Sequence, residues 1–501
     1  MSELFQKLQP YLDRAFALGS ACTLFNWDQY SAPKESIENT AKIIGILSGE
    51  QYRALINDQV KELLPRLSTE DAQKELSFHE KAIVRLLNKQ YDKLSLIPPE
   101  EYSAYSALLA QAYPIWEAAK NNNDYASYAP TLEKIIEYSK KFAAYAQKDG
   151  QTLYDAALDD YEEGFTTKIL DDFFSRLRTA LAPLVKAIRQ KQDVINVRCL
   201  QKFYPADTQK EFCHFLAQYI GFDFNRGLMS ESEHPFTTNL HNHDVRFTNH
   251  YYENKLDSAI FSAIHEAGHG LYEQGIDDDI TMTLAGGGTS MGMHESQSRF
   301  YENNVGRSLE FWKPIYGKLV QLYPQQLSDV SLEEFYKAIN ASCPSLIRTE
   351  ADELTYPFHI MIRYEIEKAI FAGEVTVDEL PALWNKKYEE YLGITPQNDT
   401  EGILQDMHWS GGSFGYFPSY AIGSAIAAQI YHHLETVMPV KTCLEEGNLM
   451  PIRDYLKEHI HRFGCCKTTQ EILTDMTGEG FNPEYYIQYL TEKYSRLYEL
   501  R

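Results

Sequence analysis

The sequence predicts a mainly α-helical protein, and three observations support this prediction. Apolar residues recur at spacings of three, four and seven along most of the chain, which is the period of an amphipathic helix. One stretch, residues 234–252, instead alternates polar with apolar residues among turn formers, as short strands do. The chain has 501 residues, of which 44% are hydrophobic and 24% are charged, so it can bury a large core.

Residues 1 to about 200 predict long antiparallel helices. Residues 75–91 carry their apolar side chains on one stripe, and residues 132–146 repeat the pattern. The expected breaks between helices fall at Pro98-Pro99, at residues 121–124 and at Gly164. Because none of these breaks is long enough to be a flexible linker, we expect a single domain over residues 1–501.

Residues 234–252 predict one or two short strands, because Val245, Phe247 and Thr248 lie among turn formers. Helical patterning resumes at Leu256 and continues to the C-terminus. Two glycine-rich loops interrupt this pattern, at residues 284–293 and 408–420. The residues with the strongest chemical signal lie between and around these loops.

The charge balance argues against two classes of partner. The chain has 47 basic and 71 acidic residues and a net charge of −24, which disfavours nucleic acid and anionic membrane surfaces. Seven cysteines without a CxxC pair suit a reducing compartment. Residues 1–17 lack the pattern of a signal peptide, and the apolar stretch at 420–431 is too short to span a bilayer. We therefore expect a cytoplasmic protein that does not enter a membrane.

The sharpest local signal is an HExxH motif, His265-Glu266-Ala267-Gly268-His269, within a predicted amphipathic helix. Four residues advance about 6 Å along a helix and return to nearly the same face, so both imidazoles can bind one ion. Glu266 lies about 100° around the helix from His265. It can therefore accept a proton from a water at the metal instead of ligating it.

A catalytic zinc site of this kind needs a third protein ligand from another segment. Glu273 lies about 12 Å along the helix from His265, too far to share an ion bound at about 2.1 Å. The histidine of the metzincin pattern is replaced by Gly275. We choose Glu295, which leaves a fourth position for water; it could instead form a salt bridge or a helix cap.

Other polar residues near the motif are assigned more modest roles. Glu302 lies two turns after Glu295 and is predicted to orient a ligand histidine. Four further histidines are more simply explained as surface or internally hydrogen-bonded residues: His241, His243, His250 and His294.

Six segments in this order resemble the motifs of one known family: residues 234–236 (HPF), 244–248 (DVRFT), 265–269 (HEAGH), 294–297 (HESQ), 347–352 (IRTEAD) and 402–409 (GILQDMHW). Together they resemble the carboxypeptidase Taq family of thermostable metallocarboxypeptidases. Residues 50–200 match that family mainly in their helical character.

The resemblance implies a Zn²⁺-dependent exopeptidase, with Co²⁺ as an alternative metal, that releases single residues from free peptide C-termini with broad side-chain tolerance. It implies a helical metallopeptidase fold with a deep active-site groove, a roof formed by residues 1 to about 200, and a small antiparallel sheet near the metal in a catalytic body over about 201–501. It also implies a homodimer. The ligands and the general base that it places on this chain agree with those assigned from geometry: His265, His269, Glu295 and Glu266.

Two arginines are candidates for binding the substrate carboxylate, because a planar guanidinium matches that ion. Arg348 is the first choice, since residues 347–354 look like a helix lining the groove. It could instead pair internally with Glu350 or Asp352. Arg246, in the DVRFT segment with Asp244, is better explained as part of a strand that braces the metal helices, with some prospect of ligand contact.

Water attack on an amide places negative charge on the former carbonyl oxygen, so hydrogen-bond donors besides the metal are needed. His408 and Tyr416 lie eight residues apart across a glycine-rich loop, and Tyr420 is a second hydroxyl nearby. The spacing resembles the histidine and tyrosine donors of related helical oligopeptidases. The chain has 35 tyrosines, however, and most tyrosines serve in packing. Gln405 and Asp406 are predicted to orient His408.

Two alternative functions remain open from the sequence. The first is an endo-acting or dipeptide-releasing oligopeptidase, since the same metal ligands serve both reactions. The second is a non-catalytic binding protein with a retained metal site, which the presence of Glu266 disfavours.

Overall fold

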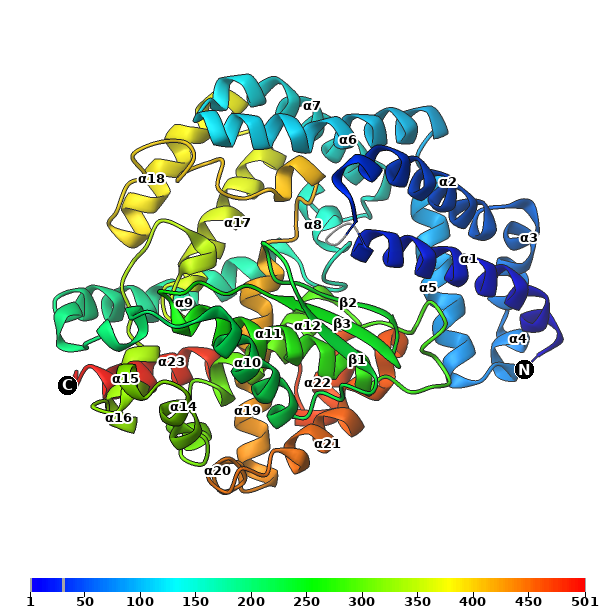
Figure 1. Ribbon diagram of the computed structural model, residues 1–501. Coiled ribbons are helices and arrows are strands. Elements are labelled where there is room, and N and C mark those ends of the chain that lie inside the picture. Colours follow the sequence, from blue (N-terminus) through cyan, green and yellow to red (C-terminus); the bar gives the residue numbers. More distant parts are fainter. Residues whose placement is uncertain (1, 29–31, 501) are drawn as a thin grey trace.

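The structure, a computed structural model, describes residues 2–28 and 32–500 of the chain (Figure 1). The first 200 residues form helices, as predicted. Their bounds are α1 (Glu3–Asp28), α2 (Ile37–Leu55), α3 (Asp58–Leu67), α4 (Glu70–Glu75), α5 (Phe78–Ser95), α6 (Pro99–Asn122), α7 (Tyr125–Ala146), α8 (Leu153–Leu158) and α9 (Thr167–Arg189). In Figure 1, α1–α5 lie to the right and α6 and α7 cross the top of the molecule.

The predicted breaks coincide with helix ends. Helix α6 begins at Pro99, where the missing backbone N–H costs no helical hydrogen bond. It ends at Asn123, whose positive φ of 53° terminates the helix before α7 begins. Within the stretch 75–91, a capping box between Ser77 and Glu80 starts α5 separately from α4.

The apolar side chains form two main clusters. The larger cluster includes α6–α9 and the rest of the chain to the C-terminus. The smaller one joins α1, α3 and α5 to the loop after the HExxH helix, through residues that include Leu8, Leu12, Leu64, Leu87, Ile276, Ile280 and Ala285. The N-terminal helices in this cluster therefore pack against the segment that follows the HExxH helix. The proposed division near residue 200 stays a prediction.

A three-stranded sheet lies beside the HExxH helix. Its strands are β1 (Gly227–Glu231), β2 (Thr237–His241) and β3 (Asp244–Asn249), in the order β1-β3-β2. The predicted stretch supplies β2 and β3, which pair antiparallel as expected. The sequence did not predict β1, which pairs parallel with β3 and makes the sheet mixed.

Helices form the remainder of the body, with α11 at its centre against α10, α12, β2 and β3. Their bounds are α10 (Ala206–Ile220), α11 (Leu256–Gly275), α12 (Met291–Arg299), α13 (Leu309–Trp312), α14 (Tyr316–Leu322), α15 (Pro324–Leu327), α16 (Leu332–Ile339), α17 (Tyr356–Ala372), α18 (Leu380–Leu392), α19 (Pro418–Val437), α20 (Val440–Glu445), α21 (Met450–His459), α22 (Thr469–Thr477) and α23 (Glu484–Leu497). Among the described residues, no helix is both long enough and apolar enough to cross a membrane.

Candidate active site

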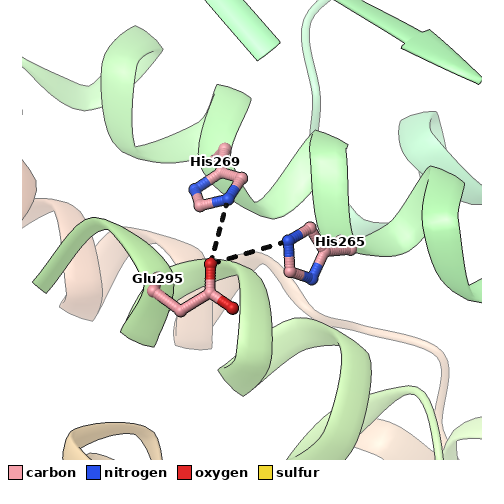
Figure 2. Close-up of side chains that lie close together, drawn as sticks. All are labelled: His265, His269 and Glu295. Carbon is pink, nitrogen blue, oxygen red and sulfur yellow. Dashed lines mark ion pairs between the residues drawn. The ribbon is translucent and has the colours of Figure 1, made fainter. Parts of the chain in front are cut away.

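Helices α11 and α12 bring His265, His269 and Glu295 together (Figure 2). One carboxylate oxygen of Glu295, Oε2, lies 3.7 Å from Nε2 of His265 and 3.5 Å from Nε2 of His269. The close packing of the two helices depends on Gly268, because a Cβ there would lie 2.9 Å from the Cα of Ser298. The glycine inside the HExxH motif is thus explained by helix packing.

The three side chains fit a divalent cation. Ligand atoms bound at about 2.1 Å to a tetrahedral ion lie about 3.4 Å from one another, close to the two distances observed. The other carboxylate oxygen of Glu295, Oε1, accepts a hydrogen bond from Nε of Arg299 at 2.6 Å, which leaves Oε2 facing the histidines. Both histidine side chains keep 16% of their surface exposed, so the cluster can be reached from solvent.

Electrostatics hold Glu295 and His269 in the charge states that metal binding requires. At His265 burial lowers the pKa, but Glu295 and Glu302 outweigh burial and raise the pKa above its usual value. Burial alone raises the pKa of a carboxyl, but Arg299 and the two histidines hold the pKa of Glu295 well below its usual range. Burial also lowers the pKa of His269 to about 3, so its imidazole is neutral. An anionic carboxylate and a neutral imidazole are the forms that coordinate a cation.

His265 is oriented by a carboxylate, as predicted for Glu302. Its Nδ1 lies 2.9 Å from Oε2 of Glu302. Arg299 donates to the same oxygen at 3.0 Å, and Arg307 donates to the other carboxylate oxygen of Glu302, Oε1, at 3.3 Å. Although burial raises the pKa of Glu302, Arg299 and His265 bring it down to about 2, so the carboxylate is ionised.

His269 is oriented by a different kind of partner, which sequence reasoning missed. Its Nδ1 lies 2.6 Å from Nδ1 of His294, whose Nε2 lies 2.6 Å from Oε1 of Glu273. Glu273 does not join His265, His269 and Glu295, which we call the ligand cluster. This agrees with the helix geometry, but Glu273 has this second role. The available signal was its spacing, since Glu273 follows His269 by four residues on the same stripe.

Glu266 lies beside the ligand cluster and is held by the sheet. The hydroxyl of Thr237 on β2 lies 2.6 Å from Oε2 of Glu266. Burial raises the pKa of Glu266 above its usual value, which makes it a better proton acceptor when ionised.

Arg348 belongs to a buried cluster of charged and aromatic side chains. Its Nε donates to Oδ1 of Asp406 at 2.9 Å, and its Nη1 donates to the hydroxyl of Tyr356 at 3.1 Å. The second oxygen of Asp406 accepts from Arg363. Arg348 also lies over the ring of Tyr420, with its guanidinium carbon 4.9 Å from the ring centroid. We call these five residues the arginine cluster.

Three sequence-based interpretations of this region are wrong. Residues 347–354 do not form a helix beyond a short turn at Arg348–Glu350, because Asp352 accepts from the backbone of Leu354 and Thr355 just before α17. Arg348 does not pair with Glu350 or Asp352 but with Asp406. Asp406 was predicted to orient His408. It instead fixes two arginines, and among the hydrogen bonds of the described residues none joins it to His408.

The predicted donors lie next to the arginine cluster. Nε2 of His408 is 3.2 Å from the hydroxyl of Tyr420, and the ring of Tyr416 packs against both residues. Burial and the charge of Arg348 lower the pKa of His408 to about 3, so its imidazole is neutral. The glycine-rich loop at residues 408–420, which we call the donor loop, is anchored by Glu367. This carboxylate accepts hydrogen bonds from Trp409 and from the backbone N–H of Gly415.

Arg246 is not placed in either cluster. It forms two hydrogen bonds of 2.7 Å with Asp244 at the start of β3 and lies over the ring of Trp27 on α1. This arrangement agrees with the preferred interpretation of Arg246 as part of a strand that braces the two helices, since β3 packs against α11.

The two clusters are joined through Tyr356. Arg348 donates to its hydroxyl, and the guanidinium of Arg299 lies over its ring at 4.4 Å. Arg299 in turn binds Glu295 of the ligand cluster. A helical fold with a His-His-Glu cluster that can hold a metal ion, an adjacent carboxylate and a neighbouring arginine is typical of the class of metallopeptidase hydrolases.

The comparisons identify the family within this class. Residues 7–494 match the model of the carboxypeptidase Taq (M32) metallopeptidases, and the chain belongs to this family. It is 45% identical to carboxypeptidase 1 of Bacillus subtilis over 98% of this chain and 97% of that protein. Solved structures of the Deinococcus radiodurans M32 carboxypeptidase and the Pyrococcus furiosus carboxypeptidase share 33% and 35% identity, with TM-scores of 0.95 and 0.94 and at least 99% of each chain covered.

The family match confirms the predicted fold class and the prediction of an enzyme, a metallopeptidase hydrolase. Family membership also implies a divalent metal, which the geometry of His265, His269 and Glu295 accommodates.

Proposed function

We propose that this protein is a carboxypeptidase that uses Zn²⁺, or Co²⁺ in its place, to release single residues with broad specificity from the free C-termini of peptides. One observation carries the proposal: a buried arginine is linked to the His-His-Glu cluster by three contacts, with Tyr356 and Arg299 between them. An enzyme that removes the last residue needs a cationic anchor close to its hydrolytic centre.

Arg348 serves as this anchor in the proposal. Its Nε and Nη1 are occupied by Asp406 and Tyr356, and among the hydrogen bonds of the described residues none uses its Nη2. The anchor would recognise the terminal carboxylate, which all peptides share. Such recognition does not select the last side chain, and this supports broad specificity.

The proposed reaction is water attack on the last peptide bond. A bound divalent cation would lower the pKa of water and polarise the scissile carbonyl. Glu266 accepts the proton of the attacking water and passes it to the leaving amine, while Thr237 holds its carboxylate in place. His408, Tyr416 and Tyr420 provide donors for the charge that develops on the carbonyl oxygen.

Three further parts of the proposal concern the protein's surroundings. We propose a homodimer, which family likeness supports and light scattering of the purified protein tests. We propose a cytoplasmic location, supported by seven cysteines, an odd number without a CxxC pair. Peptides are the proposed partners, and a net charge of −24 disfavours nucleic acid and anionic membranes.

The decisive experiment compares one peptide with a free C-terminus and the same peptide with a C-terminal amide, both followed by mass spectrometry. We expect a ladder of single-residue losses from the free peptide and an almost intact amidated peptide. Chelation should abolish the ladder from the free peptide, and Zn²⁺ or Co²⁺ should restore it. Internal fragments, or products shorter by two residues, would instead establish the oligopeptidase alternative.

A further inference from the structure

His294 occupies an unusual position for a residue that supports a metal ligand. Ligand histidines ordinarily donate their second ring N–H to a carboxylate, a backbone carbonyl or water. His265 follows this rule with Glu302, but the ring nitrogen of His269 faces another imidazole at 2.6 Å. The second imidazole then contacts a carboxylate, Glu273, again at 2.6 Å.

The geometry permits one consistent arrangement of protons along this chain. His269 presents Nε2 to Glu295 Oε2, so a metal would bind Nε2 and the proton of the neutral ring would be on Nδ1. Nδ1 of His269 then donates to Nδ1 of His294, which must accept. The proton of His294 is consequently on Nε2, and it is donated to the carboxylate of Glu273.

Glu273 is fixed from two sides by elements distant in the sequence. Its Oε2 accepts a hydrogen bond from Asn239 on β2, and its Oε1 accepts from the backbone N–H of Gly288 at 3.3 Å. The side chain of Glu273 is 7% exposed, so these bonds are shielded from water. The carboxylate is therefore a firm end point for the chain.

The glycine-rich loop also has a role in this arrangement. A Cβ at Gly288 would lie 2.6 Å from the ring of His294 and 2.9 Å from the ring of Tyr272. Only glycine lets the loop come close enough to donate to Glu273 while His294 stays in place. The glycine-rich loop and the sheet thus both contact the His294–Glu273 pair behind His269.

We propose that His294 and Glu273 are positioning residues that form a relay, His269 to His294 to Glu273, and that this relay sets the tautomer and orientation of His269 for metal binding. The inference rests on the proposed assignment of His265, His269 and Glu295 as ligands. It assigns a function to His294, which would otherwise be a packing residue, and to the glycine at position 288.

The test measures Zn²⁺ affinity of the chelator-treated protein by competition with a chromophoric chelator. We expect His294→Leu to raise the dissociation constant for Zn²⁺ by about 10- to 100-fold, the usual effect of losing such a partner. His294→Asn should recover most of the loss, because its Oδ1 can accept from His269. His461→Leu is the matched control, since the rings of His461 and His294 both lie 5.1 Å from that of Tyr272 but His461 binds Gln297. The control should bind Zn²⁺ as the unmodified protein does.

A second measurement does not depend on any variant. Nitrogen-15 NMR of the Zn²⁺-loaded protein labelled at histidine should show His294 protonated at Nε2 and His269 protonated at Nδ1. His294 protonated at Nδ1 would overturn the proposal, and so would unchanged affinity in folded His294→Leu. If His265→Ala and His269→Ala leave Zn²⁺ binding intact, the proposed ligand assignment fails, which is a separate result from a failure of the relay.

Discussion

The ligand cluster and the arginine cluster are neighbours, but they are built differently. The ligand cluster takes its residues from two packed helices, α11 and α12, and its charged groups keep an exposed edge. The arginine cluster gathers residues from a short turn, from α17, from the loop before α19 and from α19 itself, and it is held by buried ion pairs. The first is local in sequence, whereas the second depends on contacts more than 40 residues apart.

Under the proposed function, this difference separates two tasks of a carboxypeptidase. The ligand cluster has the groups needed for the chemical step, which is the same for every peptide bond. The arginine cluster has the groups that can distinguish a free carboxylate from the rest of a chain. Substitutions in the ligand cluster should therefore slow the cleavage of all substrates. Substitutions in the arginine cluster should slow the cleavage only of substrates with a free C-terminus.

Glu266→Gln should have the largest effect. The amide cannot accept a proton, so we expect kcat to fall about 10³-fold on every peptide, within the range of general-base catalysis. Zn²⁺ content should stay unchanged, because Glu266 is not one of the clustered ligands. Steady-state kinetics and metal analysis of the same preparation check both points, and turnover near the normal rate would exclude Glu266 as the base.

Arg348→Lys should have the next largest effect, restricted to free C-termini. A lysine keeps the charge but loses the planar fork, so we expect a loss of about 2 to 3 kcal/mol in binding the carboxylate. This corresponds to a fall in kcat/KM of roughly 10²-fold. The residual cleavage of the amidated peptide should not change. An equal loss on both peptides would show that Arg348 supports the fold or the chemistry instead.

The contrast between the clusters also explains what could be predicted from the sequence. That His265 and His269 share one helix face follows from helical spacing alone. The position of Glu266 beside them follows from the same helix. Glu295 was found because a zinc site needs a third ligand from a second segment. The helical fold was predictable because apolar spacing repeats along the whole chain, and helix ends had proline and asparagine signals at Pro99 and Asn123.

Other features depend on packing that local spacing does not encode. Asp406 reaches Arg348 and Arg363 only after α17 and the loop before α19 are assembled. The turn of His294 toward His269 depends on how closely α12 packs on α11. Strand β1 owes its place to a parallel pairing with β3 rather than to a clear alternation of its own.

Glu367→Gln tests the anchoring of the donor loop through the pH dependence of stability. Burial raises the pKa of Glu367 to about 7, above its unfolded value of 4.5. The folded state therefore binds more protons than the unfolded state between about pH 4.5 and pH 7, and the stability that this group contributes is lost as pH rises through that range. We expect the free energy of unfolding of the unmodified protein, relative to the variant, to fall by about 2 kcal/mol between pH 5.5 and 8.

Urea unfolding at several pH values measures this difference, and Glu75→Gln, which alters an exposed carboxyl on α4, is the control. The control should track the unmodified protein at every pH. A pH-independent difference for Glu367→Gln would mean that the carboxyl is not a buried group with a raised pKa.

Thr237→Val should have the smallest effect. This effect should be on the chemical step at the ligand cluster and not on recognition of the free carboxylate. Valine keeps the branched shape that suits β2 but removes the hydroxyl that contacts Oε2 of Glu266 at 2.6 Å. Losing one hydrogen bond to a charged group of this kind costs about 1.5 kcal/mol, so kcat should fall about tenfold on free and amidated peptides alike. Thr238→Val is the matched control, because the next residue on a strand faces the opposite side. If Thr237→Val changed only the free peptide, the base and the carboxylate anchor would not be separate systems, and the division between the two clusters would have to be given up.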